Sequence, residues 1–446
     1  MLITHGTLVT WENPNRVLTD HAIYIEEGVI RQIGPTAELV ALYPQAEIMD
    51  AKGQWVMPGN ICAHTHFYGA YARGMGIPGE PPIDFPAILT RLWWNLDKAL
   101  DRDAVRASAL VCLVDAIKHG TTTLVDHHAS PNAIEGSLDL IAEAMTTAGL
   151  RGVLCYEVTD RDGMDKAEAG IAENVRFIQK YASHPRIRGT FGLHASLSLS
   201  DATLRKCRDV LPDSAGFHIH VAEHEADEQD SLEKYGMCVI PRLNQLGILG
   251  AKSIAAHCVH VDDDELAILK ETGTWITHQP RSNMNNAVGA MAFDTMISQG
   301  QKLCLGNDGF SNVMWEDWKA AYFMHKLVSR DARQANGADI AMIATQNNAR
   351  LVETFFPEKQ LGQLIVGAQA DMIFVNYQPF TPFTDGNLPW HILFGFEASM
   401  ITTTIVDGVV LMRDRQLLTL DETEITRVAM ELAPRVWERY QSYAQA

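Results

Sequence analysis

A histidine and a carboxylate stand close together in the stretch Phe217–Glu223, whose sequence is FHIHVAE. The stretch reads as a short buried strand that carries His220, with Glu223 three residues later. Imidazole is the commonest metal ligand near neutral pH, and a carboxylate just beyond a strand end can move protons beside a metal-activated water molecule. Because a single strand histidine is more often a hydrogen-bonded core residue, the interpretation depends on what other strands bring to the same place.

Many histidines of this chain lie at the ends of predicted strands. The chain has 17 histidines, and those at strand ends are His64, His66, His127, His128, His194, His220, His257 and His278. Asp308 closes the last predicted strand. Burying so many imidazoles around one place costs free energy unless they share a ligand or a substrate. The pattern therefore favours one functional site over a set of unrelated core residues.

One subset has the composition of a catalytic metal site. His64 and His66 are two residues apart on a strand, so their side chains face the same way and can reach one ion. With His220 and Asp308 they supply three nitrogens and one oxygen and leave a position open for water, as in a catalytic zinc or iron site. The fourth strand, which ends at His194, contains no lysine or glutamate that would bridge a second ion. We therefore expect one divalent metal ion.

Three residues around the expected metal suit proton transfer. A metal ion lowers the pKa of a bound water molecule to near neutrality, and Asp308 can accept its proton while it binds the metal. Glu223 is placed to carry protons to the substrate, and His257 to hydrogen-bond the hydroxide or the tetrahedral intermediate. We predict catalytic roles for these three residues.

Such a site needs a scaffold that brings strand ends together, and the chain from Trp55 onward predicts one. Strand-like runs alternate with helical segments, as expected of a parallel α/β fold. The runs cover residues 56–63, 121–126, 151–158, 187–193, 217–222, 254–259, 275–278 and 303–308. Roughly eight such units match a (β/α)8 TIM barrel, whose strand ends point to one mouth. A doubly wound open sheet is the alternative, but no glycine-rich phosphate loop follows the first strand.

The two ends of the chain predict a second, smaller unit. Residues 1–54 contain short strand-like runs with a turn at Glu27-Gly28, and the alternation of strands and helices stops after Glu353. Short strands return between Leu361 and Met412, and a last helix begins near Glu422. We expect a small β-sandwich domain built from both termini, with the chain divided at 1–54, 55–360 and 361–446.

The composition is typical of a soluble globular enzyme. Of the 446 residues, 47% are apolar and 20% are charged. The formal net charge of −19 argues against a nucleic acid or an anionic membrane surface as a partner. Seven scattered cysteines without a C-x-x-C pair suit a reducing compartment. Because no signal peptide and no membrane-spanning apolar run is recognisable, we expect a cytoplasmic protein.

Several motifs follow one another over nearly the whole chain: VMPGNICAHTH, HIHVAE, AAHCVH, THQPRSNMNN, LGNDG and LGQLIVGAQADMIFVN. Together they resemble the amidohydrolase superfamily, in its branch of metal-dependent aminohydrolases and chlorohydrolases (the ATZ/TRZ type). The segments LWWNLDKAL and DHHASP are most similar to the SsnA-type aminohydrolases. The resemblance implies a homodimer. It also implies site roles: metal ligation by His64, His66, His220 and Asp308, acid–base roles for Glu223 and His257, and a substrate contact for His194.

The reaction that we predict is hydrolytic deamination of an amino-substituted nitrogen heterocycle, purine-like or pteridine-like. Hydroxide attacks the carbon that bears the amino group, Glu223 protonates the adjacent ring nitrogen, and His257 and the metal hold the adduct before ammonia departs. We expect zinc, with iron as the alternative metal. Ring-opening hydrolysis of a cyclic amide such as a hydantoin and dechlorination are rival reactions. A catalytically silent scaffold is the remaining alternative, and the intact ligand set argues against it.

Aromatic residues after the first predicted strand are candidates to stack on a flat ring, although helix packing explains them equally well. They are Phe67, Tyr68, Phe85, Trp93 and Trp94, of which Trp93 is our first choice. Arg281 is a candidate partner for a carbonyl or acidic group of the substrate, with a surface salt bridge as the alternative.

Three further histidines are candidate substrate contacts. His278 is followed by Gln279, where family members commonly have asparagine, a change that could alter the pocket. The doublet His127-His128 is less usual in this branch, and it suits either a substrate contact or a second ion.

Overall fold

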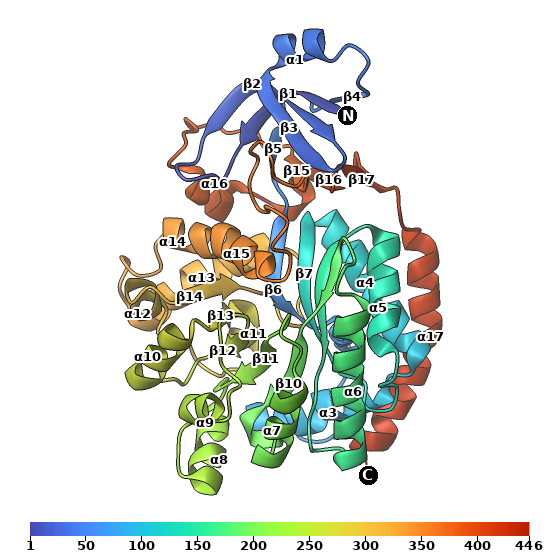
Figure 1. Ribbon diagram of the computed structural model, residues 1–446, viewed down its shortest axis with the longest axis vertical. Helices are drawn as coiled ribbons and strands as arrows, with labels where there is room; N and C mark the ends of the chain where they lie inside the picture. Colours follow the sequence, from blue (N-terminus) through green and yellow to red (C-terminus); the bar gives the residue numbers. More distant parts are fainter. Residues whose placement is uncertain (446) are drawn as a thin grey trace.

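The computed structural model describes residues 1–445 and contains a barrel with a smaller β domain at one end (Figure 1). Within those residues, no helix combines the length and the apolar character that crossing a membrane requires. The barrel strands form two parallel sheets, β6–β9 and β10–β14, which isolated parallel bridges at Thr65–Asp308 and Val158–Leu193 join. The predicted (β/α)8 barrel is therefore confirmed.

The barrel strands are short, and their residues are almost all buried. Strands β9 and β10 follow one another with a single residue between them and serve as the fourth stave of the barrel. The strands are β6 (Asn60–Thr65), β7 (Thr121–His128), β8 (Arg151–Tyr156), β9 (Ile187–Gly189), β10 (Phe191–Ala195), β11 (Phe217–Val221), β12 (Ile254–His257), β13 (Trp275–His278) and β14 (Lys302–Leu305).

Helices surround these strands, and several begin at the predicted caps. Ser200 accepts a hydrogen bond from the Thr203 amide at the start of α7. Asp262 and Glu265 form a capping box at the start of α10, and Gly273 ends that helix in the left-handed conformation. The helices are α4 (Arg102–Lys118), α5 (Ser137–Ala148), α6 (Met164–Lys180), α7 (Asp201–Val210), α8 (Glu225–Tyr235), α9 (Val239–Gln245), α10 (Asp263–Thr272), α11 (Pro280–Asn285), α12 (Phe293–Ser298), α13 (Met314–Ser329), α14 (Gly337–Met342) and α15 (Asn348–Glu353).

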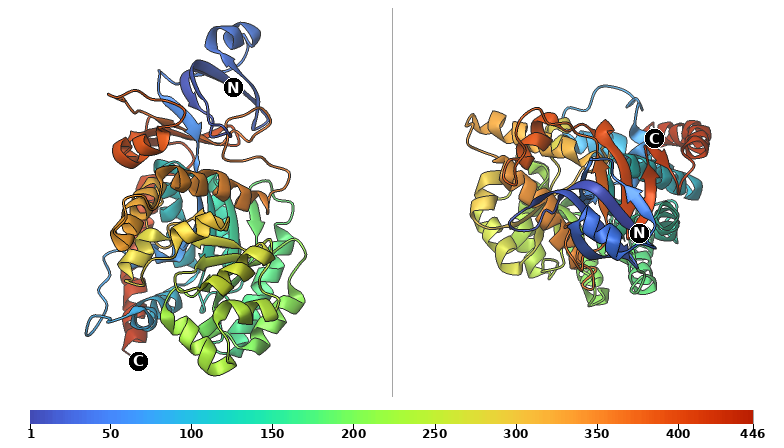
Figure 2. Two further views of the ribbon diagram at one scale, coloured as in Figure 1. Left: turned by 90° about the vertical axis from the view of Figure 1, so that its left-hand side faces the viewer. Right: turned by 90° about the horizontal axis from the view of Figure 1, so that it is seen from above.

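The smaller domain is one sheet of nine strands that combines both ends of the chain, as predicted (Figure 2). Strand β5 lies between β1 and β15 and so joins the N-terminal strands to the C-terminal ones. Apolar residues from both halves share one core, which includes Ile23, Val56, Phe374 and Ile405. The strands are β1 (Leu2–Val9), β2 (Val17–Glu26), β3 (Val29–Pro35), β4 (Ile48–Asp50), β5 (Trp55–Pro58), β15 (Met372–Val375), β16 (Ile401–Val406), β17 (Val409–Arg413) and β18 (Gln416–Leu417).

The first apolar run, predicted as a single strand over 56–63, is divided between two sheets. Trp55–Pro58 pairs in the nine-stranded sheet, and Asn60–Thr65 begins the barrel. Gly59 lies between them, and a Cβ atom there would lie 2.2 Å from Thr122 Cγ2. The chain can change sheets at this position because glycine lets it pass against the second barrel strand.

The mouth of the barrel faces away from the smaller domain. Arg151, at the start of β8, is fully buried and donates to Asp371 Oδ2 at 2.8 Å and Asp407 Oδ1 at 2.6 Å. These two carboxylates belong to the smaller domain, so the N-terminal ends of the barrel strands lie against it. The C-terminal strand ends open on the opposite side, where α3 (Trp94–Ala99) lies and where the C-terminal helix α17 (Glu422–Ala444) packs on α3 and α4 (Figure 1).

Candidate active site at the barrel mouth

Three histidines and an aspartate meet at the C-terminal ends of β6, β11 and β14. Asp308 Oδ1 lies 3.3 Å from His64 Nε2 and 3.0 Å from His66 Nε2. His66 Nε2 in turn lies 3.2 Å from His220 Nε2. The structure therefore brings together the four residues that the sequence predicts as metal ligands.

Backbone carbonyl groups orient two of these imidazole rings. His66 Nδ1 donates to the His127 carbonyl at 2.5 Å, and His220 Nδ1 donates to the His194 carbonyl at 2.9 Å. Because a carbonyl oxygen only accepts, Nδ1 carries the proton in both rings and each Nε2 presents a lone pair when the ring is neutral. Two lone pairs at this distance repel each other unless a proton or a metal cation lies between them.

The donor set fits a zinc ion. Ligand nitrogens about 2.0–2.1 Å from a tetrahedral zinc lie about 3.4 Å from one another, and the contacts among His66, His220 and Asp308 are close to that spacing. His64 Nε2 is buried and has no hydrogen-bond partner among the described residues, while its Nδ1 lies 2.8 Å from His218 Nε2. A metal-binding histidine typically has one ring nitrogen fixed by a hydrogen bond and the other free for the metal, and His64 has this arrangement.

The charges of the cluster also favour a cation. Burial by itself would raise the pKa of Asp308, but the neighbouring imidazoles of His64 and His66 hold it well below its ordinary value. Burial lowers the pKa of His64 to about 3 and that of His220 well below its ordinary value. For His66 the nearby Asp308 carboxylate outweighs burial and raises the pKa to about 9. Asp308 thus draws a positive charge into the cluster, either a proton on His66 or a metal ion.

At two strand ends the backbone adopts the left-handed conformation, which directs the side chains of Asp308 and His257. Asp308 has φ of 57° and His257 has φ of 73°, a region that costs a residue with a Cβ about 1 kcal/mol or more. At Gly306, a Cβ would lie 2.7 Å from the His64 carbonyl oxygen, so glycine permits the close approach of the eighth strand to the first. The Asp308 amide then donates to the same carbonyl at 3.1 Å.

Glu223 and His257 lie next to each other beside the cluster. His257 Nε2 is 3.4 Å from Glu223 Oε2, and burial raises the pKa of Glu223 well above its ordinary value. His257 also has a ring nitrogen within 4.8 Å of ligand atoms of His64, His220 and Asp308, so it is close enough to join the ligand set. The arrangement places a carboxyl group with a raised pKa and an imidazole at the edge of the metal cluster.

Helix α11 and Asn286, the residue that follows it, position three of the predicted site residues through contacts that the sequence did not predict. Ser282 Oγ donates to Asp308 Oδ2 at 2.5 Å. Asn283 Oδ1 accepts from His257 Nδ1 at 2.9 Å, and Asn286 Nδ2 donates to Glu223 Oε1 at 3.4 Å. The signal was present in the motif PRSNMNN, because Asn286 is four residues from Ser282 and three from Asn283, and residues at these spacings are neighbours on a helix surface.

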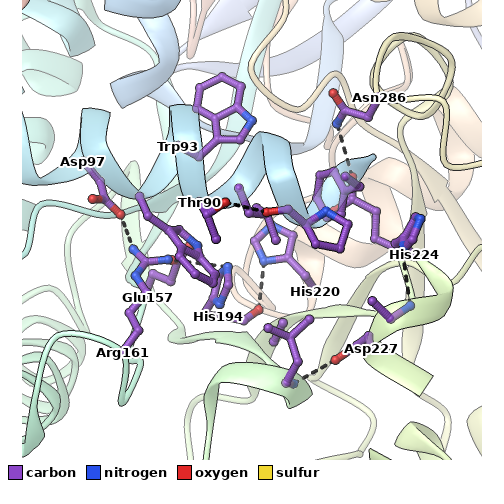
Figure 3. A pocket seen from close by; sticks show the side chains of 18 of the residues that line it. Thr90, Trp93, Asp97, Glu157, Arg161, His194, His220, His224, Asp227 and Asn286 are labelled. Atoms are coloured by element: carbon purple, nitrogen blue, oxygen red, sulfur yellow. Dashed lines mark hydrogen bonds and ion pairs between the residues drawn. The ribbon is translucent and has the colours of Figure 1, made fainter. Parts of the chain in front are cut away.

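A pocket of about 1120 Å³, part of which is open to solvent, lies over the cluster (Figure 3). His194 and Trp93, two of the predicted substrate contacts, line it together with His66, His220, Glu223 and Asp308. Its other walls include Tyr68, Phe85, Leu89, Trp94, Leu197, His224, Asp227 and Asn286.

A network of buried charges, also missed from the sequence, forms one side of this pocket. Arg161 pairs with Asp97 and lies 3.4 Å from Glu157 Oε1. Burial raises the pKa of Asp97 to about 7. Burial would also raise the pKa of Glu157, but the hydrogen bond with His127 and the charge of Arg161 hold it well below its ordinary value. Glu157 directly follows the third barrel strand, and this position was the available signal.

Four other predicted substrate contacts do not line the pocket. His128 Nε2 bonds to Ser130 Oγ at 2.9 Å, and His278 Nε2 lies 3.0 Å from His325 Nε2. Arg281 is engaged away from the pocket by Asp317, with contacts of 2.6 and 3.0 Å, and by neighbouring groups. These three side chains are turned toward partners behind the mouth, which their positions at strand ends did not reveal.

His127 is the fourth, and it lies between the cluster and the charge network. Its Nε2 donates to the carbonyl groups of Leu193 and His218, both at 3.1 Å. Its Nδ1 is 3.3 Å from Glu157 Oε2, and one of its ring nitrogens is within 4.8 Å of ligand atoms of His66 and His220. The two roles predicted for His127, a substrate contact and a ligand of a second ion, stay predictions.

Comparisons with known proteins agree with this geometry. The model of the amidohydrolase family matches residues 55–411. A 5'-deoxyadenosine deaminase of Methanosarcina mazei is 30% identical over 99% of both chains. A 5-methylthioadenosine/S-adenosylhomocysteine deaminase of Desulfitobacterium hafniense is 30% identical over 97% of both. The crystal structure of an adenosine deaminase from Xanthomonas campestris with bound zinc superposes with a TM-score of 0.85, at 23% identity and 98% coverage of both chains, and this likeness concerns the fold.

Proposed function

The chain belongs to the amidohydrolase family, and from this premise we propose that it deaminates an amino-substituted nitrogen heterocycle, purine-like or pteridine-like, by metal-dependent hydrolysis. One observation supports the proposal most strongly. The orphaned His64 nitrogen and the facing Nε2 atoms of His66 and His220 surround Asp308 at the base of a pocket. A proton-carrying carboxyl group, Glu223, stands beside them.

We assign the metal to His64, His66, His220 and Asp308, with His257 next to them. Zinc suits three imidazole nitrogens and a carboxylate oxygen, and iron remains the alternative. When bound there, the metal supplies an activated water molecule at neutral pH and Lewis-acid stabilisation of negative charge. The role of the surrounding residues is to place the substrate carbon at this point and to move protons around it.

Glu223 moves the protons. Its raised pKa keeps a proton on the carboxyl group, which can pass to the ring nitrogen next to the amino-bearing carbon. Addition of water to that carbon gives a tetrahedral adduct, and transfer of a proton to the amino group lets ammonia leave and a carbonyl form. His257 donates from Nδ1 to Asn283, so its Nε2 is free to accept a hydrogen bond from the hydroxyl group of the adduct.

The pocket wall suits a flat heterocycle. Phe85, Trp93 and Trp94 contribute aromatic side chains, and His194 adds a polar contact. The relatives named above act, by their names, on adenosine-type nucleosides, which supports a purine-like substrate here. We also propose a cytoplasmic location, which agrees with seven free cysteines. The family resemblance suggests a homodimer, and we propose that oligomeric state.

A screen for ammonia release tests the function. The zinc-loaded protein is incubated with amino-substituted purines, pteridines and triazines, with 5'-deoxyadenosine and 5'-methylthioadenosine, and with hydantoins and a chlorinated triazine. Deamination predicts ammonia without a new carboxylate. A new carboxylate would instead identify ring opening, and chloride would identify dechlorination. Metal-loaded, folded protein that turns over no compound would refute the proposal and favour the silent scaffold.

A further inference from the structure

Glu157 and His194 lie side by side on the pocket wall. Glu157 Oε1 is 3.9 Å from His194 Nε2, and both residues line the pocket. Glu157 follows strand β8 and is 3% exposed, and His194 belongs to strand β10. They lie on one side of His220, and Asn286, the partner of Glu223, lies on the other (Figure 3). A ring whose amino-bearing carbon sits near Glu223 therefore turns another edge toward this pair.

Glu157 retains the capacity to accept hydrogen bonds from a ligand. Its oxygens lie 3.3 Å from His127 Nδ1 and 3.4 Å from Arg161 Nη1. Charge-assisted hydrogen bonds are normally about 2.7–2.9 Å long, so these contacts neutralise the carboxylate without using its lone pairs fully. Arg161 is at the same time paired with Asp97 and Asp162, so Glu157 shares its guanidinium group with two other carboxylates.

His194 also presents an acceptor to the pocket. Ser198 Oγ donates to the Ala195 carbonyl at 3.2 Å, so the same hydroxyl must accept from His194 Nδ1, 2.5 Å away. The proton of the neutral ring is therefore on Nδ1, and Nε2 carries a lone pair. Glu157 and His194 together form a pair of acceptors with no donor between them.

We propose that this pair selects heterocycles that present N–H groups at the ring edge: amino-oxo rings with a lactam N–H, as in guanine, pterin or cytosine. The inference rests on the proposed deamination and names its substrate class. An adenosine-type ring offers only acceptor nitrogens apart from its reacting amino group. Against Glu157 and His194 the ring edge of such a compound would set acceptors against lone pairs, and only its ribose hydroxyl groups could donate. The specificity of this chain thus differs from that printed in the names of its relatives.

The first test compares substrates on the unaltered, zinc-loaded protein by ammonia release. We expect kcat/KM for the best of guanine, pterin and cytosine to exceed that for adenosine and 5'-deoxyadenosine by at least about 100-fold. Equal or faster turnover of the adenosine-type compounds would overturn the inference and leave the proposed deamination intact. If no compound of either type releases ammonia, the proposed function fails and the inference with it.

The second test replaces the substrate N–H itself. Methylation of the lactam nitrogen, as in 1-methylguanine against guanine, is expected to lower kcat/KM of the wild type by at least about 100-fold. In Glu157→Gln, kcat/KM for the unmethylated substrate should fall about 100-fold. The ratio of kcat/KM between the unmethylated and the methylated substrate should then shrink to within about 10-fold, because the substitution and the methylation remove the same contact. An unchanged penalty in the variant would overturn the assignment. Glu168→Gln, an exposed glutamate on α6, is the matched control and should behave as wild type; zinc content and thermal melting verify that each variant is folded.

Discussion

The two charged regions of the pocket bury their charges in opposite ways. In the network on the pocket side, Arg161 supplies the positive charge that Asp97 and Glu157 need. In the cluster at the strand ends, Asp308 is surrounded by imidazoles, and burial keeps most of them neutral. The first region contains a cation of its own, Arg161, whereas the second needs a cation from outside. A network of the first kind shapes a pocket, and a cluster of the second kind binds a metal.

The two regions also differ in the elements that hold them. The cluster side chains come from barrel strands, and backbone carbonyl groups orient their rings. The aromatic wall comes from a short helical segment after the first strand: α2 (Phe85–Ile88), the π-helical turn η2 (Leu89–Trp93) and α3. Strand ends can hold reacting groups rigidly, while connecting segments can vary without disturbing the barrel. We therefore expect changes in the cluster to abolish the reaction and changes in the wall to alter substrate preference.

Removal of the metal should have the largest effect. A chelator is expected to abolish ammonia release, and zinc should restore it, because only the cluster lacks its own counter-charge. Bound metal also stabilises the folded state, so we expect Tm to fall by about 5 °C or more while circular dichroism still shows a folded protein. Full activity in protein that metal analysis shows to be metal-free would contradict the conclusion that the histidine–aspartate cluster needs a cation.

Loss of one ligand should come next. For His220→Ala we expect metal content to fall far below one ion per chain and kcat/KM to fall more than about 1,000-fold, because an Nε2 lone pair of the cluster is lost. The matched control is His278→Ala, a buried strand-end histidine that contacts His325 instead. The control should keep its metal even if Tm is lower. Retention of the metal by His220→Ala would refute the ligand assignment.

Glu223→Gln should separate proton transfer from metal binding. The substitution removes the transferable proton but keeps the shape of the side chain, so kcat should fall about 100- to 10,000-fold with metal content unchanged. Glu225→Gln, an exposed neighbour, serves as control and should retain full activity. An unaltered kcat in Glu223→Gln, measured by ammonia release under saturating substrate, would assign the proton transfer to another group.

The smallest effect is expected at the aromatic wall. Trp93→Ala removes a stacking surface that the substrate meets in the ground state and the transition state alike, so KM should rise about 10-fold and kcat should change less than about 3-fold. Trp390→Ala, a partly exposed tryptophan on α16 (Leu388–Gly395), should change neither constant. A large fall in kcat for Trp93→Ala would show that the wall also aligns the reacting atoms.

Much of this architecture was predictable from local sequence. The alternation of apolar strands and helices predicted the barrel, and the H-x-H pair with His220 and Asp308 predicted a shared cluster, because parallel strand ends converge in such a fold. The split of the first run at Gly59 was not predictable, since it depends on the approach of Thr122 from another strand. The helix α11 motif was visible, but its contacts with Asp308, His257 and Glu223 depend on how that helix crosses the mouth.

The sequence by itself determined which residue types stand at the strand ends, because periodicity and spacing are properties of the chain alone. It could not tell which strand-end histidines face the pocket: His66 and His194 do, while His128 and His278 turn to Ser130 and His325. Those directions follow from packing against residues far away in the chain, as does the pairing of Glu157 with His194. Tertiary structure therefore decided which of many candidate groups became a site, since the energy of a buried polar side chain depends on the partners that the fold brings to it.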